Sequence, residues 1–262
     1  MKTQAEHEQL ADLVRRGFHS VVFQPIRRFS DETLFGFEAL MRGPEGTVLE
    51  NPASIFRSDA VDRSLLHEID SACILSAVRL GRVLDGSLFV NIHGETLLRH
   101  ATQRDDIMRL LPIVDVDPRR VVLEISETTD KAHVRAIKRS LQPLRNLGMR
   151  LALDDIGVFS SWLHHMVSLE AEFMKIDRQF ITNIDSSPSK MRLLRGFVAF
   201  ARETGAELIV EGVEREEEHA AVLDSGVDLA QGFFYGHPEP VQTWIDLSEA
   251  VPDQTRVSAV FE

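Results

Sequence analysis

The sequence predicts an α/β fold, a TIM-type (β/α)8 barrel with an irregular antiparallel first strand. Three observations lead to this prediction. Eight short apolar runs, rich in β-branched residues, occur within the 262 residues. Helical patterns lie between most of these runs, as in βα repeats. The first two runs are instead joined by a segment that is too short to hold a crossover helix.

The expected strands are, in chain order, residues 21–26, 34–41, 87–92, 120–125, 150–155, 172–177, 207–212 and 229–236. From the third run onward, roughly 20 to 35 residues separate successive strand ends, the spacing of a parallel βα repeat. Only residues 27–33 separate the first two runs, which should therefore form an antiparallel hairpin. Eight strands favour a closed barrel, and a doubly wound open sheet is the structural alternative.

Three of the connecting segments have the spacing of amphipathic helices. In residues 63–84 we expect one buried face, made by Leu65, Leu66, Ile69, Ala72, Cys73 and Ser76. In residues 131–149 the apolar stripe consists of Val134, Ile137, Leu141 and Leu144. Gly148 then stands where this helix would end, and Gly205 ends the helix expected at 189–206 in the same way.

We expect one domain over residues 1–262. Its barrel core would cover about residues 19–247, with an N-terminal helix at 3–17 and a C-terminal tail at 248–262. No Pro-, Gly- or Ser-rich linker and no low-complexity stretch interrupts it. With no sensory or cyclase-like segment expected in this chain, regulation would come through a homodimer interface or a regulatory partner.

Composition excludes some classes of partner. The formal net charge is −12, with 44% apolar and 27% charged residues. A polymeric nucleic acid or an anionic membrane would need clustered Lys and Arg, so neither is expected as a partner. A phosphate-bearing substrate remains possible, because divalent cations bridge acidic residues to phosphate. A lone Cys73, no signal-peptide pattern and no long apolar window indicate a cytoplasmic protein.

Polar side chains end nearly every expected strand. In a TIM-type barrel these ends meet at one face, where active sites lie. The residues at or just past the strand ends are Glu38, Asn91, Glu124, Glu127, Asp154, Asp155, Lys175, Asp177, Glu211 and Gln231. Any single one could be a solvated loop residue, but so many on one face predict a shared site.

The chemistry of this set indicates a metal site. Carboxylates brought together raise one another's pKa unless cations neutralise them. Oxygen ligands without Cys or His favour Mg²⁺ or Mn²⁺ over zinc. The adjacent pair Asp154 and Asp155 would fit two divalent ions, an arrangement used in phosphodiester hydrolysis. Lys175 would position the attacking water or compensate phosphate charge.

Histidine and aromatic residues near these strand ends have simpler explanations. We expect His164 and His165 to be solvated or capping residues in a helix-like stretch, and His93 to make ordinary polar packing rather than touch substrate. Of Phe233, Phe234 and Tyr235, at least two should pack in the core, although stacking on a guanine base is the alternative.

Eight motifs, in order along nearly the whole chain, resemble the EAL domains, the phosphodiesterases of cyclic di-GMP. They are FQPI (23–26), FEALMR (37–42), FVNI (89–92), LEISE (123–127), LDDIG (153–157), MKIDRQF (174–180), VEGVE (210–214) and AQGFFYGHP (230–238). A lone Glu-Ala-Leu tripeptide would carry no weight. The ordered set is highly specific.

The resemblance implies a role for each matched residue. Glu38, Asn91, Glu124 and Asp154 would hold one metal ion, and Asp154 and Asp155 would contribute to a second. Glu211 would be a metal-water ligand or general base, and Lys175 would orient the nucleophilic water. Gln24, Leu40, Arg42 and Gln231 would bind substrate or support the site. Glu127 would anchor the loop after its strand. Asp177 and Glu214 would contact the ligand residues without binding the metal themselves.

The implied reaction is attack of a metal-activated water on one phosphodiester bond of cyclic di-GMP, which opens the ring to linear pGpG. This chain departs from the family after the aspartate pair, where IGVFSSWL (156–163) stands in place of the usual FGTGYSSL. That loop is associated in the family with dimerisation and with the second metal site. IHGE (92–95) after Asn91 and Gly43 after Arg42 also differ, without removing an expected ligand.

The alternative function is a catalytically weak or inactive EAL domain that acts as a cyclic di-GMP receptor or a protein-interaction module. Such domains usually lack the EAL glutamate, an aspartate of the pair or the lysine. Glu38, Asp154, Asp155 and Lys175 are all present here, which favours the enzyme. The altered loop is the feature that keeps the alternative open.

Overall fold

The computed structural model describes residues 20–29, 31, 33–43, 63–103, 115–126, 133–157 and 162–250. The helix expected at 3–17, Glu127, residues 158–161 of the altered loop and nearly all of the expected tail lie outside these residues.

All eight expected strands form. They are β1 (Ser20–Arg28), β2 (Leu34–Arg42), β3 (Ser87–Asn91), β4 (Val121–Ser126), β5 (Arg150–Ile156), β6 (Phe173–Ile176), β7 (Glu207–Val210) and β8 (Leu229–Gln231). Strands β2 to β8 lie side by side in sequence order and are parallel. Strand β1 closes the barrel between β8 and β2 and is antiparallel to both. The predicted barrel with an antiparallel first strand is therefore confirmed, and the open sheet is excluded.

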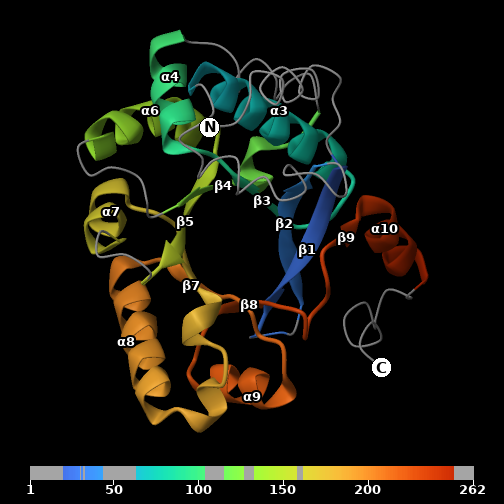
Figure 1. The fold of residues 1–262 in the computed structure, drawn as a ribbon, viewed down its shortest axis with the longest axis vertical. Helices are drawn as coiled ribbons and strands as arrows, with labels where there is room; N and C mark the ends of the chain where they lie inside the picture. Colours follow the sequence, from blue (N-terminus) through green and yellow to red (C-terminus); the bar gives the residue numbers. More distant parts are fainter. Residues whose placement is uncertain are drawn as a thin grey trace, which may run out of the picture.

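Helices surround the strands (Figure 1). The helices in the described residues are α3 (Arg63–Gly81), α4 (Gly94–Gln103), α6 (Val134–Asn146), α7 (Trp162–Leu169), α8 (Pro188–Thr204), α9 (Glu216–Asp224) and α10 (Val241–Ala250). A short strand β9 (Glu239–Pro240), which the sequence did not indicate, pairs with β1 ahead of α10. Helix α10 extends three residues into the expected tail.

Helix ends and faces follow the sequence in most respects. Gly205, at φ +74°, caps α8, and Gly148, at φ +94°, follows α6, because both adopt the left-handed conformation that glycine tolerates. The apolar stripe of α6 is buried as expected. The expected face of α3 was partly wrong: Leu66, Ala72 and Ser76 are only half-buried, because the helix turns a different apolar stripe inward, and the side chain of Leu65 lies outside the described part of the chain. That stripe consists of Ile69, Cys73, Ile74, Ala77 and Val78.

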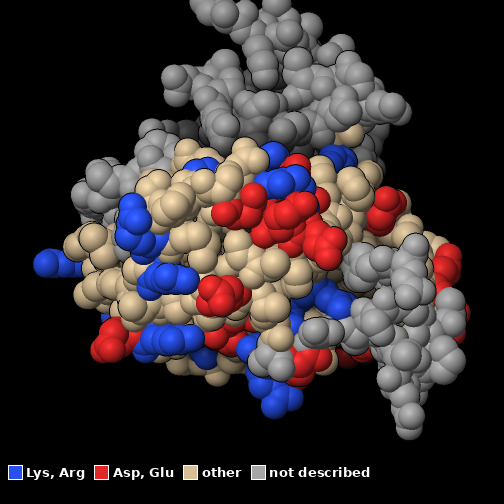
Figure 2. Space-filling model, turned by 90° about the horizontal axis from the view of Figure 1, so that it is seen from below, with Lys and Arg blue, Asp and Glu red and all other residues tan. Residues whose placement is uncertain are grey.

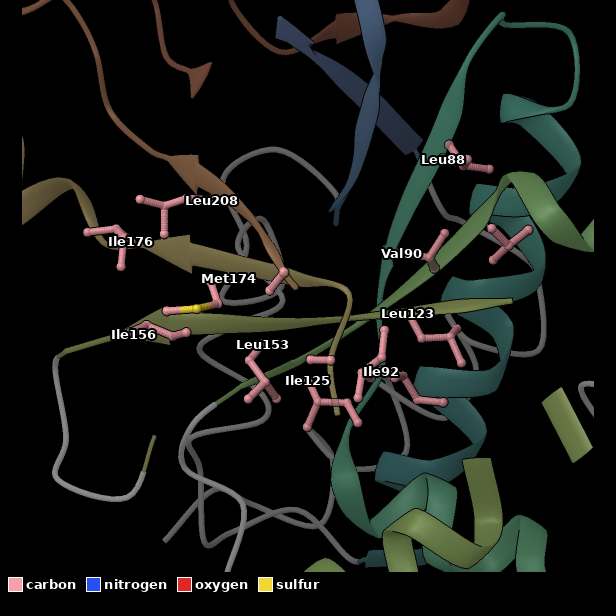
Figure 3. Packing of buried hydrophobic residues seen from close by; sticks show 14 of the residues in the cluster. Leu88, Val90, Ile92, Leu123, Ile125, Leu153, Ile156, Met174, Ile176 and Leu208 are labelled. Atoms are coloured by element: carbon pink, nitrogen blue, oxygen red, sulfur yellow. The ribbon is translucent and has the colours of Figure 1, made fainter. Parts of the chain in front are cut away.

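Two apolar layers result from the alternation of side chains along each strand. Outward-facing residues such as Leu88, Leu123 and Leu153 pack under the helices in the larger core (Figure 3). A second cluster is made by Ile26, Phe89, Val122, Ala152, Phe173, Ile209 and Leu229. These residues come from seven neighbouring strands and alternate with the outward-facing ones, so they fill the barrel interior.

The charged surface is mixed. The face seen in Figure 2 carries acidic side chains gathered on one part and separate Lys and Arg side chains on another. The described part of this face shows no continuous basic band of the kind that a nucleic-acid backbone would need. No helix in the described ranges is long and apolar enough to cross a membrane.

The close contact of β2 with β3 at Gly36 generates a stability prediction. A Cβ atom at Gly36 would lie 2.1 Å from the backbone oxygen of Ser87, so Gly36→Ala must push two paired strands apart. We expect the free energy of unfolding to fall by about 2–3 kcal/mol, measured by chemical denaturation. The matched variant is Gly196→Ala in α8, where no atom lies within 4 Å of the added carbon. It should gain about 0.5–1 kcal/mol from helix propensity. Equal stability of the two variants would contradict this packing.

Candidate active site

The barrel interior changes from apolar to polar over two residues of each strand, which is one period of the side-chain alternation. Two residues beyond the apolar interior residue, on the same side of the strand, stands a polar one. Asn91 follows Phe89, Glu124 follows Val122, Asp154 follows Ala152, Lys175 follows Phe173, Glu211 follows Ile209 and Gln231 follows Leu229. Strand β1 runs the other way, so Gln24 precedes Ile26. The apolar residues of the barrel interior thus lie directly beneath the polar layer.

Lys175 lies at the centre of this layer with its side chain fully buried. Its ammonium contacts carboxylates from β2, β4 and β5 and that of Glu211, which directly follows β7. The distances from Nζ are 2.7 Å to Glu211 Oε1, 2.8 Å to Glu124 Oε1, 3.1 Å to Glu38 Oε2 and 3.6 Å to Asp154 Oδ1. The structure therefore brings together residues predicted from widely separated segments, and one positive charge faces four acidic groups.

Glu38 is held in place by amide side chains. Gln231 Nε2 donates to Glu38 Oε2 at 2.7 Å and also to Gln24 Oε1 at 3.0 Å. Asn91 Nδ2 donates to Glu38 Oε1 at 3.2 Å. Gln24 Nε2 in turn donates to the backbone oxygen of Gly236 at 3.2 Å. Both oxygens of Glu38 are thus oriented, and β1, β2, β3 and β8 are joined at the site.

The aspartate pair occupies a bulge in β5. Leu153 pairs with Met174 and Ile156 pairs with Ile176, so two residues, Asp154 and Asp155, stand opposite Lys175 alone. Asp155 adopts φ +58°, and its N–H donates to Asp154 Oδ1 at 2.9 Å. Side chains of adjacent strand residues normally point to opposite faces, and a bulge removes that alternation. Aspartate is among the few residues that tolerate this backbone conformation.

The pKa shifts follow from burial and charge imbalance. Burial, opposed by Lys175, raises the pKa of Asp154 to about 6 and that of Glu211 to about 8. Burial and the neighbouring Glu38 hold the pKa of Glu124 well above its usual value. Burial also acts to raise the pKa of Glu38, but Lys175, Gln231 and Asn91 outweigh it and the pKa is lowered. Four carboxylates and one ammonium therefore share protons as a unit.

The remaining expected residues lie at the rim. Leu40 and Arg42 follow Glu38 on the same side of β2, and Arg42 Nη1 donates to Met41 O at 2.9 Å. Asp177 accepts from Gln179 N at 2.8 Å and so caps the turn after β6.

Glu214 lies in the loop after β7, where its Oε1 is 3.0 Å from Arg178 Nη2. Asp177 and Glu214 therefore fix the two loops that follow Lys175 and Glu211, by contacts to loop residues.

The histidine and aromatic residues near the strand ends differ in their burial. His164 is exposed in α7, but His165 is 1% exposed, so a solvated role for His165 was wrong. The helix turns His165 toward the barrel with Met166 and Leu169. Tyr235 is buried and Phe234 is half-buried against His219, as expected for two core-packing aromatics. Phe233 is exposed and stacks on His237.

The donor set suits a hard divalent cation. It is made of carboxylate and amide oxygens, and Glu124 Oε2 is a buried acceptor without a hydrogen-bond partner. In the described part of the chain, no three acidic, histidine or cysteine side chains converge around one point as ligands. Lys175 Nζ stands between them. The residues fit a cation in chemistry, and binding would require the carboxylates to share their charge between the cation and Lys175.

Comparison with known proteins agrees with this geometry. The family model for the EAL domain matches residues 7–238. The chain belongs to the EAL family. The cyclic di-GMP phosphodiesterase RocR of Pseudomonas aeruginosa is 28% identical over 251 residues, which cover 92% of this chain and 64% of RocR. The signaling protein YkoW of Bacillus subtilis is 25% identical, over 88% of this chain and 30% of YkoW. This EAL chain thus spans less than two thirds of these relatives.

Solved EAL structures have the same fold. The Klebsiella pneumoniae BlrP1 complex with manganese and cyclic di-GMP superposes with a TM-score of 0.76 at 25% identity, over 86% of this chain and 57% of BlrP1. The MucR phosphodiesterase from Pseudomonas aeruginosa, in complex with cyclic di-GMP, gives 0.77 at 26% identity, over 90% of this chain and 99% of the crystallised MucR chain. Relatives of this EAL domain therefore bind the cyclic dinucleotide, in BlrP1 together with manganese.

Sequence reasoning missed one buried acidic group close to the site. Asp70 in α3 is 4% exposed and accepts a hydrogen bond from the backbone of His93, two residues after Asn91. Its only signal in the sequence is an aspartate on the apolar side of an otherwise amphipathic helix, next to Ile69, Cys73 and Ile74. The bulge at the aspartate pair had no sequence signal beyond the pair itself.

The shared protons generate a pH prediction for the metal-free protein. A folded pKa of about 8 for Glu211 lies above the unfolded value, so its stabilising effect is present at low pH and is lost as pH rises through 8. In EDTA, we expect the free energy of unfolding to fall between about pH 6.5 and pH 8.5. Saturating Mn²⁺ should flatten this slope, because the cation replaces the protons.

Two variants control this pH measurement. Glu211→Gln should remove most of the slope in EDTA, and Glu203→Gln on the exposed face of α8 should leave it unchanged. If the stability of the metal-free wild-type protein rises over this pH range, the folded cluster does not bind more protons than the unfolded chain.

Proposed function

We propose that this EAL domain hydrolyses cyclic di-GMP to linear pGpG in a reaction that requires Mg²⁺ or Mn²⁺. The observation that carries the proposal is the convergence of Glu38, Glu124, Asp154 and Glu211 on the Lys175 ammonium. This cluster lies where the barrel strands end, in a member of a family whose relatives include cyclic di-GMP phosphodiesterases. Together with Asn91 and Gln231, the cluster offers the oxygen and amine groups that a cation-dependent phosphodiester hydrolysis would use.

Two groups of residues would hold the divalent ions. Glu38, Asn91, Glu124 and Asp154 would offer oxygens to one ion, and Asp154 and Asp155 would offer oxygens to a second, with Glu211 beside the attacking water. When bound, the ions supply neutralisation of the phosphoryl oxygens and activation of the attacking water. Gln231 and Asn91 hold both oxygens of Glu38 in fixed directions, which prepares that carboxylate for a ligand role.

Proton transfer and charge balance fall to Lys175 and Glu211. The water oxygen forms a bond to phosphorus, and the bond from phosphorus to the ribose 3′-oxygen breaks. Glu211, in its ionised form, would accept the proton of the water. Lys175 keeps its positive charge, since the surrounding carboxylates raise its pKa against the effect of burial, and it orients the water and offsets developing negative charge. The 3′-oxygen takes up a proton from solvent water and leaves as a hydroxyl, and Glu211 returns its proton to solvent.

Substrate binding would use the rim of the barrel. Gln24, Leu40 and Arg42 lie beside Glu38 on β1 and β2, where a ribose-phosphate segment bound at the cluster would extend. Gln231 links Gln24 to Glu38 and so aligns the substrate-binding and metal-binding residues. Asp177 and Glu214 would keep the loops after β6 and β7 in place. Glu127, for which we keep the role of a loop anchor, is outside the described residues.

The direct test is product analysis. Purified protein is incubated with cyclic di-GMP and Mg²⁺ or Mn²⁺, and the nucleotides are separated by chromatography. We expect pGpG to form, and we expect EDTA to abolish it. Glu38→Gln should lower kcat/KM by at least about 100-fold, because it removes a ligand charge at the centre of the cluster. Glu203→Gln serves as the matched control and should retain wild-type activity.

One outcome would favour the alternative function. Wild-type protein that binds cyclic di-GMP but leaves it intact with either metal would be a receptor or interaction module. The altered loop at 156–163 would then be the place to look for the lost step. A homodimer or regulatory partner belongs to the same proposal, and sedimentation of the protein with and without cyclic di-GMP measures the first of these.

A further inference from the structure

Asp70 is a buried carboxylate that contacts the start of a second helix. It lies in α3 with 4% of its surface exposed. The backbone N–H of His93 donates to its Oδ2 at 2.9 Å, and the Thr96 side chain hydrogen-bonds to the same carboxyl group. His93 directly precedes α4, and Thr96 lies in its first turn. Asp70 therefore acts as a cap for α4 supplied by a neighbouring helix, a position where negative charge is favourable.

The turn between β3 and α4 is held from two sides. On the barrel side, Ile92 N donates to Glu124 O at 2.9 Å, and Ile92 packs in the same apolar cluster as Ile125 (Figure 3). On the outer side, Asp70 holds the N–H of His93. Between these contacts the backbone of residues 91–93 has little freedom to move.

Asn91 depends on this turn for its position. It is the last residue of β3, its side chain is exposed at the mouth of the barrel, and its Nδ2 contacts Glu38 Oε1 at 3.2 Å. Because Asn91 is exposed, it lacks the packing that fixes the other site residues. Apart from its bond to Glu38, its orientation depends on its own backbone, and Asp70 anchors that backbone two residues on.

We propose that Asp70 is a positioning residue, which sets the Asn91 amide beside Glu38 and thereby tunes the affinity of the site for its divalent cation. This inference rests on the proposed function, since it assigns Asn91 to the cation site. Burying a carboxylate is costly unless it gains hydrogen bonds, and the donors from His93 and Thr96 supply them. Burial also raises the pKa of Asp70 to about 6, which agrees with its enclosure.

The test measures Mn²⁺ binding to the protein without nucleotide, by calorimetry and by the electron paramagnetic resonance of the ion. Asp70→Ala should weaken Mn²⁺ binding by about 10-fold or more, as loss of a group that orients a ligand does. Asp70→Asn keeps an oxygen that can accept from His93 N and should restore most of the affinity. If Asp70→Ala does not fold, Asp70→Ser breaks the same contact with a smaller change in volume.

A matched control separates positioning from stability. Asp228 also accepts from a backbone N–H, that of Leu208 at 3.1 Å, but at the opposite end of the barrel. Asp228→Ala should lower thermal stability without changing Mn²⁺ affinity. In an Asn91→Ala background, Asp70→Ala should have almost no further effect on Mn²⁺ binding, because it acts through Asn91.

The outcomes are distinguishable. Asp70→Ala protein that is folded and binds Mn²⁺ as tightly as the wild type would overturn the positioning role alone. Effects of Asp70→Ala and Asn91→Ala that add in full would also overturn it. Wild-type protein that binds no Mn²⁺ at all would overturn both this inference and the proposed function.

Discussion

The contact of one buried ammonium with four carboxylates determines the charge balance on which the rest of the site depends. Lys175 is enclosed by the barrel, and each carboxylate near it loses water when the chain folds. Such a cluster is stable only if its negative charge is balanced, and a single lysine cannot balance four acids. The acids therefore retain protons or take up cations. This imbalance makes the same residues a cation site and a place where a proton can be accepted near neutral pH.

The barrel supplies the constraint that brings these groups together. Each parallel strand points an apolar residue inward and, two positions later, a polar one. The apolar interior cluster and the polar layer above it therefore result from the same alternation. The antiparallel β1 joins this scheme by placing Gln24 opposite Glu38. Amide side chains then fix Glu38 from both sides. The apolar floor excludes water beneath the cluster, which strengthens every charge interaction above it.

The strands and the polar layer could be predicted because both leave a period-two pattern in the sequence. That pattern predicted the eight strands. It also predicted that five strand-end residues form one group, namely Glu38, Glu124, Asp154, Lys175 and Glu211. Three features did not. The bulge at Asp154 and Asp155 depends on backbone conformation, the burial of His165 depends on how α7 is rotated, and the contact from Asp70 joins segments 23 residues apart. Each depends on tertiary packing that hydrophobic periodicity does not encode.

The most direct test of the account is anomalous diffraction from crystals of this EAL domain grown with Mn²⁺ and cyclic di-GMP. We predict a manganese peak within about 2.0–2.6 Å of oxygens of Glu38, Asn91, Glu124 and Asp154, the range of separations between hard cations and oxygen ligands. Lys175 should then lie beside the ion and no longer among all four acids. Crystals that contain cyclic di-GMP but show no manganese at these carboxylates, with Lys175 still at their centre, would contradict a cation-dependent active site.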